Sequence, residues 1–181
     1  MRSLKSFSLV GALLLLSAVA HANSLRIWSY DAANADTRHQ AGALTFEIDK
    51  HLIFTKVLRV LATEGQAKAD VTQVDERVLG RGGLTALIGN RALERDLYQI
   101  EPRDEGPAMI AALCPKSKRA WLAFGRLRAY HDLRIRVLGD DGAGNGAHLC
   151  TTLEYSFHGE WKLPNEARFD TRIVQQPQFP K

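Results

Sequence analysis

The stretch WLAFGRLRAYHDLRIRVL, residues 121–138, decides which fold the chain is expected to adopt. Within it, residues 121–128 and 133–138 are typical of two antiparallel strands, and residues 129–132 suit the turn between them. The second strand alternates apolar residues with arginines, which is the period of a strand with one buried face. The stretch therefore predicts a hairpin with an apolar face and a polar face.

A third strand is expected downstream of the hairpin, at residues 149–158 (LCTTLEYSFH). Its odd-numbered positions would face the core and Glu154 would face the other side, because successive side chains of a strand alternate between its faces. The glycine-rich segment 139–146 would connect this strand to the hairpin. The C-terminal part of the domain is thus predicted to be a three-stranded antiparallel sheet.

Two further strands are predicted upstream of the hairpin. Residues 24–30 (SLRIWSY) are typical of a short strand, and residues 44–48 alternate apolar and polar side chains. Residues 31–40 are polar and are expected to form a loop. Residues 52–62 fit a helix by the spacing of their apolar residues and a strand by their β-branched content, and residues 93–100 are equally ambiguous. The pattern decides neither of these two segments.

Two short helices are predicted in the middle of the chain. Residues 84–88 lie between glycine-rich turns, and residues 107–114 begin at a proline and end before Pro115. Together with the strands, they predict an α+β fold. We expect a single domain with a mainly antiparallel sheet and one or two short helices.

The first 22 residues have the pattern of a secretory signal peptide. Two basic residues precede an apolar run at residues 9–20, and a small-x-small cleavage site ends at Ala22. The apolar run is too short to span a bilayer. We expect a mature chain that starts at Asn23 and is located in the periplasm or outside the cell.

The remaining chain has the composition of one globular domain. The full chain of 181 residues is 45% hydrophobic and 24% charged. We expect residues 23–161 to form this domain, and residues 162–181, which contain three prolines, to form an extended or partly disordered tail.

Charge and hydropathy exclude two classes of partner. Loss of Arg2 and Lys5 with the signal peptide lowers the formal net charge from +4 to +2, which is too small to favour nucleic-acid binding. No second segment is long and apolar enough for a transmembrane helix. Neither nucleic acid nor a membrane span is therefore expected.

The only two cysteines, Cys114 and Cys150, both lie in the expected mature chain. An even pair in an exported protein indicates a disulfide bond. A zinc site would need ligands beyond two sulfurs, and no CxxC or HxxxH spacing supplies them. We therefore predict a Cys114–Cys150 disulfide and no metal site.

Four arginines of the predicted hairpin are the most specific surface feature. Arg126 and Arg128 share one face of the first strand, and Arg134 and Arg136 share one face of the second. If both pairs lie on the same side of the sheet, they form a surface for carboxylate or phosphate groups. The alternative is an ordinary solvated face of an antiparallel sheet, on which Glu154 pairs with one arginine.

Two other residues near these arginines are candidates for the same surface. His131, in the predicted turn, is expected to make binding to this surface pH-dependent, because histidine is the side chain whose charge changes most readily at physiological pH. Trp121 would be an aromatic anchor for a partner, together with Tyr130. For each, a structural role as a solvated turn residue or a core residue is the alternative.

No catalytic, cofactor or metal-binding motif is present in the sequence. No serine lies in GxSxG, the GDDGAGNG segment lacks the calcium-binding pattern, and Gly80–Gly83 lacks the Lys-Ser/Thr of a P-loop. No catalytic residue and no cofactor are therefore assigned.

These observations favour a non-catalytic binding or accessory protein of a bacterial-type cell envelope. Its partner would be an acidic envelope protein or an anionic polymer, bound by the arginine-bearing face. The alternatives are an envelope hydrolase with unassigned catalytic residues and a self-associating structural protein.

Overall fold

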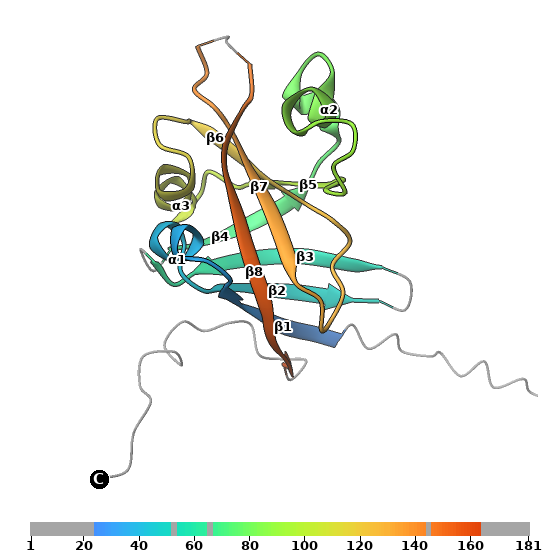
Figure 1. Ribbon diagram of the computed structural model, residues 1–181. Helices are drawn as coiled ribbons and strands as arrows, with labels where there is room; N and C mark the ends of the chain where they lie inside the picture. Colours follow the sequence, from blue (N-terminus) through green and yellow to red (C-terminus); the bar gives the residue numbers. More distant parts are fainter. Residues whose placement is uncertain (1–23, 52–53, 65–66, 144–145, 164–181) are drawn as a thin grey trace, which may run out of the picture.

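The described part of the chain, residues 24–51, 54–64, 67–143 and 146–163 of a computed structural model, folds into a closed antiparallel β-barrel (Figure 1). Each strand pairs with the next along the chain, and β8 pairs with β1. The strands are β1 (Ser24–Ala32), β2 (Leu44–Lys50), β3 (Thr55–Ala62), β4 (Ala67–Gln73), β5 (Asp96–Ile100), β6 (Arg119–Phe124), β7 (Leu133–Asp140) and β8 (His148–Lys162).

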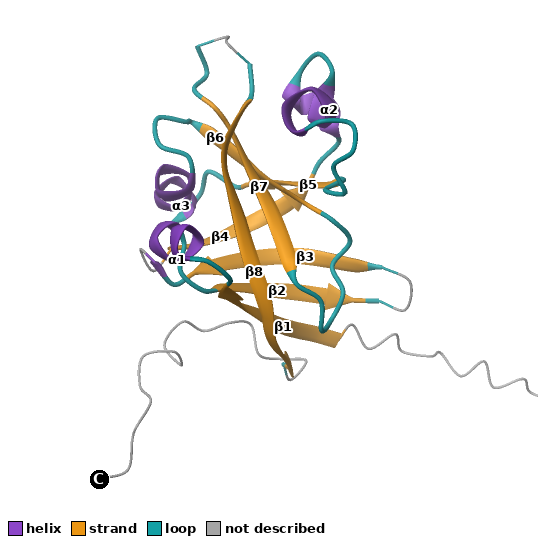
Figure 2. Ribbon diagram, viewed as in Figure 1, coloured by secondary structure: helices purple, strands orange, loops and turns teal. Residues whose placement is uncertain are grey.

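The helices are short and belong to the connections between strands (Figure 2). They are α1 (Ala35–Gln40), the 3-10 helix η2 (Glu76–Leu79), α2 (Gly83–Ile88) and α3 (Gly106–Leu113). The predictions of α2 and α3 are confirmed to within one residue at each end. None of the helices in the described ranges has the length and hydropathy needed to cross a membrane.

The predicted α+β class is wrong, because the sheet closes on itself. A strand that sequence analysis missed, β4, supplies part of the barrel wall. Its sequence AKADVTQ turns Ala67, Ala69 and Val71 inward. The alternation is regular, but two of the three inward residues are alanines, which carry a weak apolar signal. The barrel accepts such small side chains because large ones from other strands fill its interior.

The undecided segment at residues 52–62 forms a strand, β3, from Thr55 onward. The register between β2 and β3 shifts after Glu47, so that Leu58 has no partner and Val57 and Val60 both face inward. A bulge of this kind adds one residue to a strand. It explains the helix-like spacing of the two valines. Residues 52–53 lie outside the described residues.

The prediction that residues 31–40 form a loop is also wrong. Strand β1 continues to Ala32, and α1 follows. The side chain of Asn34 accepts a hydrogen bond from the backbone N–H of Thr37 at 2.8 Å, which is the geometry of a helix N-cap. The cap stabilises a helix too short to have a clear periodic pattern.

The first strand of the predicted hairpin is shorter than expected. Strand β6 ends at Phe124, and residues 125–132 form an eight-residue connection to β7. Tyr130 in this connection has a φ angle of 65°, which is unusual for a residue with a side chain. Arg126 and Arg128 therefore lie in a loop and not on a strand face.

The two ends of the barrel differ. Helices α1 and α3 lie together at one end, where the Gln40 side-chain amide donates to the Leu113 carbonyl oxygen at 3.2 Å. Met109, Ile110 and Leu113 of α3 pack into the same apolar cluster as the barrel interior. The other end is where β2 ends and β3 begins. We call it the open end.

Apolar packing occurs on both sides of the wall formed by β5, β6 and β7. The inward side chains of these strands join the main core, where Tyr98 and Phe124 stack with ring centroids 4.9 Å apart. Their outward side chains, including Leu97 and Trp121, form a second cluster with Leu84 of α2. Burial on both faces explains the unbroken apolar run of β6.

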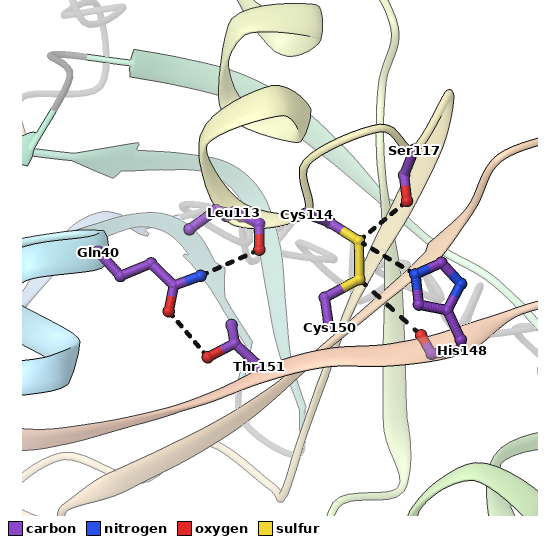
Figure 3. Close-up of a disulfide and its surroundings, with 7 residues drawn as sticks. All are labelled: Gln40, Leu113, Cys114, Ser117, His148, Cys150 and Thr151. Carbon is purple, nitrogen blue, oxygen red and sulfur yellow. Dashed lines mark hydrogen bonds between the residues drawn. A yellow bond between two sulfur atoms is a disulfide. The ribbon is translucent and has the colours of Figure 1, made fainter.

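The predicted disulfide between Cys114 and Cys150 is confirmed (Figure 3). It joins the C-terminal end of α3 to β8, with Cα atoms 5.4 Å apart. Next to it, the Thr151 hydroxyl donates to the Gln40 side-chain oxygen at 2.8 Å. The junction therefore ties α1, α3 and β8 together at the helix-covered end.

The predicted signal peptide, residues 1–22, lies outside the described residues, as does the tail from residue 164 onward. Within the described chain, β8 runs through Lys162. Both terminal segments therefore stay predictions.

We expect the double variant Cys114→Ala/Cys150→Ala to unfold with a free energy about 4 kcal/mol lower than that of the parent, because the bond closes a loop with a sequence separation of 36 residues. Urea denaturation followed by tryptophan fluorescence measures the difference. The parent protein under reducing conditions should match the variant. A difference below about 1 kcal/mol would show that the bond contributes little to stability.

Candidate binding site at the open end of the barrel

Two adjoining hollows of about 370 and 380 Å³ lie at the open end of the barrel. Because neighbouring strands are antiparallel, this end collects the last residues of β2, β4 and β6 and the first residues of β3 and β5. The hollows share four lining residues, Phe54, Thr55, Arg126 and Leu127. We call the two hollows together the mouth groove.

Aromatic side chains form the apolar part of the mouth groove. Tyr98 and Phe124 are buried and stacked on each other. Trp28 lines the second hollow and is also buried, whereas Phe54 is half exposed and stacks on His51 at 4.2 Å. Burial raises the pKa of the Tyr98 hydroxyl, so this group stays neutral. The groove therefore has one accessible ring, that of Phe54, above buried rings that belong to the core.

Basic side chains dominate the charge of the mouth groove. Lys50, Lys56, Arg126 and Arg128 line it, against a single acidic residue, Asp96. Burial raises the pKa of the Asp96 carboxyl, and the charge of Arg126 acts in the opposite direction. The groove therefore has an excess of positive charge.

The basic residues differ in their partners. Lys50 lies 3.4 Å from the Glu160 carboxylate and 5.6 Å from the ring centre of Trp28. By contrast, Lys56 and Arg128 form no ion pair with any residue that the structure describes. These two side chains are therefore the basic groups of the groove that have no ionic partner within the described chain.

One buried polar atom beside the mouth groove lacks a protein partner. The indole N–H of Trp28 is buried and has no acceptor among the described residues. An unsatisfied buried donor costs about 1–3 kcal/mol.

The structure separates the four arginines, for which sequence analysis considered a shared sheet face. Arg126 and Arg128 lie at the mouth groove, whereas Arg134 and Arg136 lie on the outer face of β7. There, Arg134 Nε donates to the Glu94 carboxylate at 2.5 Å, and Arg136 Nη1 donates to the Thr152 hydroxyl at 2.6 Å. The β7 pair is therefore engaged within the protein, and the loop pair is the one at a concave surface.

Glu94 is the residue that sequence analysis missed. It lies in the connection before β5 and is 2% exposed. Burial alone would raise the pKa of its carboxyl, but the hydrogen bond from Arg134 and the charges of Arg134 and Arg136 lower the pKa overall. A single glutamate in a loop has no periodicity or motif, so only the fold reveals its role.

The two other predicted site residues have different positions. Trp121 is 1% exposed within the outer apolar cluster, so its ring is not an anchor for a partner. His131 is exposed in the β6–β7 connection, and its ring nitrogen contacts the Ala129 carbonyl oxygen at 2.9 Å. Tyr130 beside it is 80% exposed. Of the predicted aromatic anchors, only Tyr130 is accessible.

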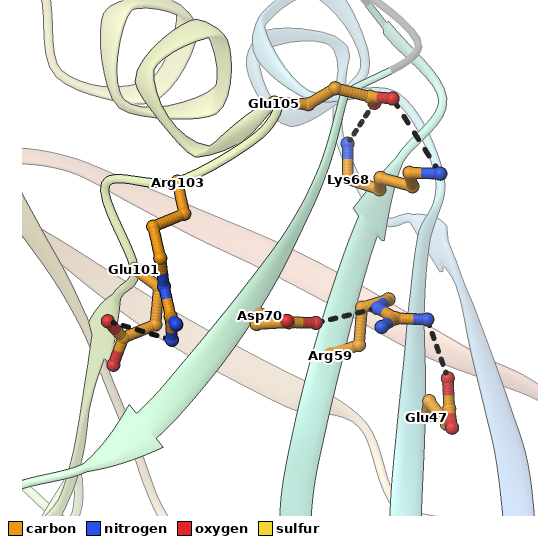
Figure 4. A network of polar contacts seen from close by, with 7 residues as sticks. All are labelled: Glu47, Arg59, Lys68, Asp70, Glu101, Arg103 and Glu105. Carbon is orange, nitrogen blue, oxygen red and sulfur yellow. Dashed lines mark hydrogen bonds and ion pairs between the residues drawn. The ribbon is translucent and has the colours of Figure 1, made fainter. Parts of the chain in front are cut away.

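A second group of charged side chains covers the outer face of β2, β3 and β4 (Figure 4). Arg59 contacts Asp70 at 2.8 Å and Glu47 at 3.4 Å, which links three neighbouring strands. Two further ion pairs, each at 3.7 Å, join Lys68 to Glu105 and Arg103 to Glu101. Because acidic and basic groups neutralise each other here, this surface selects neither sign of charge.

We expect Glu94→Gln to lower the free energy of unfolding by about 1–3 kcal/mol at neutral pH, because Arg134 and Arg136 lose a buried ionic partner. The folded pKa is lowered, so this contribution is present above the ordinary value of 4.5 and is lost as pH falls through the folded pKa. The gap between parent and variant, measured by urea denaturation, should therefore shrink below pH 4.5.

The matched control for this prediction is Glu64→Gln, since Glu64 is exposed. It should change the stability little at any pH. A gap that stays constant between neutral and acidic pH would contradict an ionic role for Glu94.

Comparison of the chain with protein-family models, with curated proteins and with solved structures finds no match.

Proposed function

We propose that this chain is a non-catalytic binding protein that holds an anionic partner at the mouth groove. The observation that carries the proposal is the combination of basic side chains with the exposed ring of Phe54 in one concave surface. Basic groups attract carboxylate, phosphate or sulfate groups, and the Phe54 ring contacts the apolar part of the same ligand. Arg126 and Arg128 keep the role that sequence analysis proposed for them, on a loop and not on a sheet.

The dimensions of the mouth groove suit a compact ligand or a protruding segment of a larger one. Each hollow is within the range of small-molecule sites, about 300–1,000 Å³. Among the lining residues, Lys56 and Arg128 have no ionic partner in the described chain, so binding an anion breaks no existing ion pair there. An acidic envelope protein or an anionic polymer would present such groups.

The proposed location is the periplasm or the outside of a bacterial-type cell. The signal-like pattern of residues 1–22 supports it. The disulfide between Cys114 and Cys150 is a second, independent support, since such bonds persist in oxidising compartments.

The second candidate function is an envelope hydrolase that uses the same groove. The observation in its favour is Asp96, whose raised pKa and position in a hollow suit a general acid. The two candidates differ in the effect of Asp96→Asn. For a binding protein, removing the only acid of the groove raises the affinity for anions. For a hydrolase, it abolishes the release of soluble fragments from purified envelope material.

We expect the double variant Arg126→Glu/Arg128→Glu to weaken the binding of an aromatic sulfonate, 8-anilinonaphthalene-1-sulfonate, by at least about tenfold. This probe has the anionic and aromatic parts that the groove is proposed to bind, and the variant reverses two of the four basic charges. A tenfold loss of affinity corresponds to about 1.4 kcal/mol of binding free energy, which is a small effect for the reversal of two charges. Fluorescence titration at low and high salt measures the affinity, which should fall with salt for the parent protein.

The matched control is Arg81→Glu/Arg91→Glu, which makes the same change of charge at two exposed arginines away from the groove. It should leave the affinity within about twofold of the parent value, apart from the general effect of net charge. Equal weakening by both double variants would mean that net charge, and not the mouth groove, attracts the probe.

A further inference from the structure

Three side chains with soft or borderline metal-binding atoms meet at the helix-covered end of the barrel (Figure 3). Cys150 and His148 belong to β8, two residues apart, and the register with β7 shifts at Cys150, which has no partner in that ladder. Cys114 reaches them from the end of α3. The two sulfurs and a ring nitrogen of His148 all lie within 4.8 Å of one another. The His-x-Cys spacing on a strand matches neither the CxxC nor the HxxxH pattern, so no sequence motif indicated this cluster.

The separation between His148 and Cys114 already fits a metal site. With bonds of about 2.3 Å to sulfur and 2.0–2.1 Å to nitrogen, tetrahedral zinc holds a sulfur and a nitrogen about 3.6 Å apart. In the disulfide-bonded protein, His148 Nε2 lies 3.9 Å from Cys114 Sγ. Only the two sulfurs would need to move apart, to about 3.8 Å in the same geometry.

The two sulfurs are buried on the side of Cys114 and accessible to solvent on the side of Cys150. Cys114 is 1% exposed, and a side chain on Gly139 would overlap the sulfurs of both cysteines. Ser117 Oγ lies 2.9 Å from Cys114 Sγ, where its hydroxyl can donate to a thiolate. Cys150 is half-buried and His148 is exposed, so a reductant, a metal ion and a water molecule as fourth ligand can enter from that side.

His148 is not committed to another structural role. Within the described part of the chain, the contact with Cys114 Sγ is the one hydrogen bond that its ring forms. Other exposed histidines have partners elsewhere, such as His158, whose ring nitrogen contacts the Asp31 carboxylate at 2.7 Å. The ring also lies near enough to Asp140 to help lower the pKa of that carboxyl, and it can turn its nitrogen to a metal ion without breaking another hydrogen bond.

We propose that reduction of the Cys114–Cys150 disulfide creates a site for a thiophilic metal ion such as Zn²⁺, with Cys114, Cys150 and His148 as ligands. Two thiols and one imidazole suit zinc and other soft or borderline metals. The disulfide and the metal exclude each other, because both use the same two sulfurs. The site is thus a redox-controlled one, and it does not depend on the mouth groove.

The reduction step balances with a dithiol as the reductant. A thiolate of the dithiol attacks the accessible sulfur of Cys150, and the bond to Cys114 breaks to leave a thiolate next to Ser117 and His148. The second thiol of the reductant then displaces Cys150, which leaves the oxidised dithiol and two reduced cysteines. Binding of Zn²⁺ releases the protons of both cysteine thiols.

The test is a zinc titration of the purified, untagged protein in its reduced and its disulfide-bonded forms, in competition with a chromophoric chelator under anaerobic conditions. We expect the reduced protein to bind one Zn²⁺ per chain and the disulfide-bonded protein to bind none at the same concentration. Co²⁺ in place of Zn²⁺ should give the intense ultraviolet absorption of cobalt–thiolate bonds. This signal separates ligation by sulfur from binding by histidines alone.

His148→Ala should weaken zinc binding by the reduced protein at least tenfold, since loss of even an outer-shell partner of a metal ligand costs about 10–100-fold. The matched control is His158→Ala, at another exposed histidine of β8, which should keep the parent affinity. Equal binding by the reduced and disulfide-bonded forms would overturn the proposal, as would unchanged binding by His148→Ala. If reduction unfolds the protein, Zn²⁺ should restore the fold, as judged by circular dichroism. Failure to restore it would also overturn the proposal.

Discussion

The pairing of the first strand with the last is the constraint on which the rest of the structure depends. Strand β8 is fifteen residues long because it serves two neighbours in turn. Its residues from His148 to Tyr155 pair with β7, and those from Tyr155 to Lys162 pair with β1. Tyr155 belongs to both ladders, and its ring is buried inside the barrel. Without this transfer, β1 and β8 would each expose an edge of unpaired backbone groups, which an open sheet must protect in other ways.

Closure also determines where each connection lies. Because an even number of strands alternate in direction, connections leave the barrel at one end and then at the other. The β1–β2 and β5–β6 connections contain α1 and α3, and they cover one end with apolar side chains and the disulfide. At the other end, the β2–β3 and β6–β7 connections contain no helix among their described residues. The β4–β5 connection contains η2 and α2, and Leu84 of α2 packs on the outer side of β5 and β6. That end is hollowed, and Arg126 and Arg128 reach it because β6 ends at Phe124.

Ion pairing decides which basic residues remain for an external partner. Glu94 lies against Arg134 and Arg136, and Arg59 is shared between Glu47 and Asp70, so these arginines are satisfied within the protein. A patch of four arginines in the sequence therefore becomes two separate groups with different roles in the fold. The same folding event brings His148 to the disulfide, although 34 residues separate it from Cys114. In both cases, a partner from a distant segment changes the chemistry of a residue that sequence analysis had treated by itself.

Local patterns predicted the features that depend on neighbouring residues. These are the alternation in β2 and β7, the proline and glycine boundaries of α2 and α3, and the pairing of the only two cysteines. In β8 the predicted alternation holds at Leu153 and Tyr155, but the register shift at Cys150 leaves Leu149, predicted to face the core, 40% exposed. The tertiary structure alone decided that the strands close into a barrel, because pairing between β1 and β8 depends on residues more than a hundred positions apart. It also decided the inward role of Ala67 and Ala69 in β4, since alanine is apolar enough for the interior only when larger neighbours fill the space around it. The position of the candidate site also depends on the fold. Arg126 and Arg128 were visible as charges, but the end of β6 at Phe124, which has no local signal, determined which surface they line.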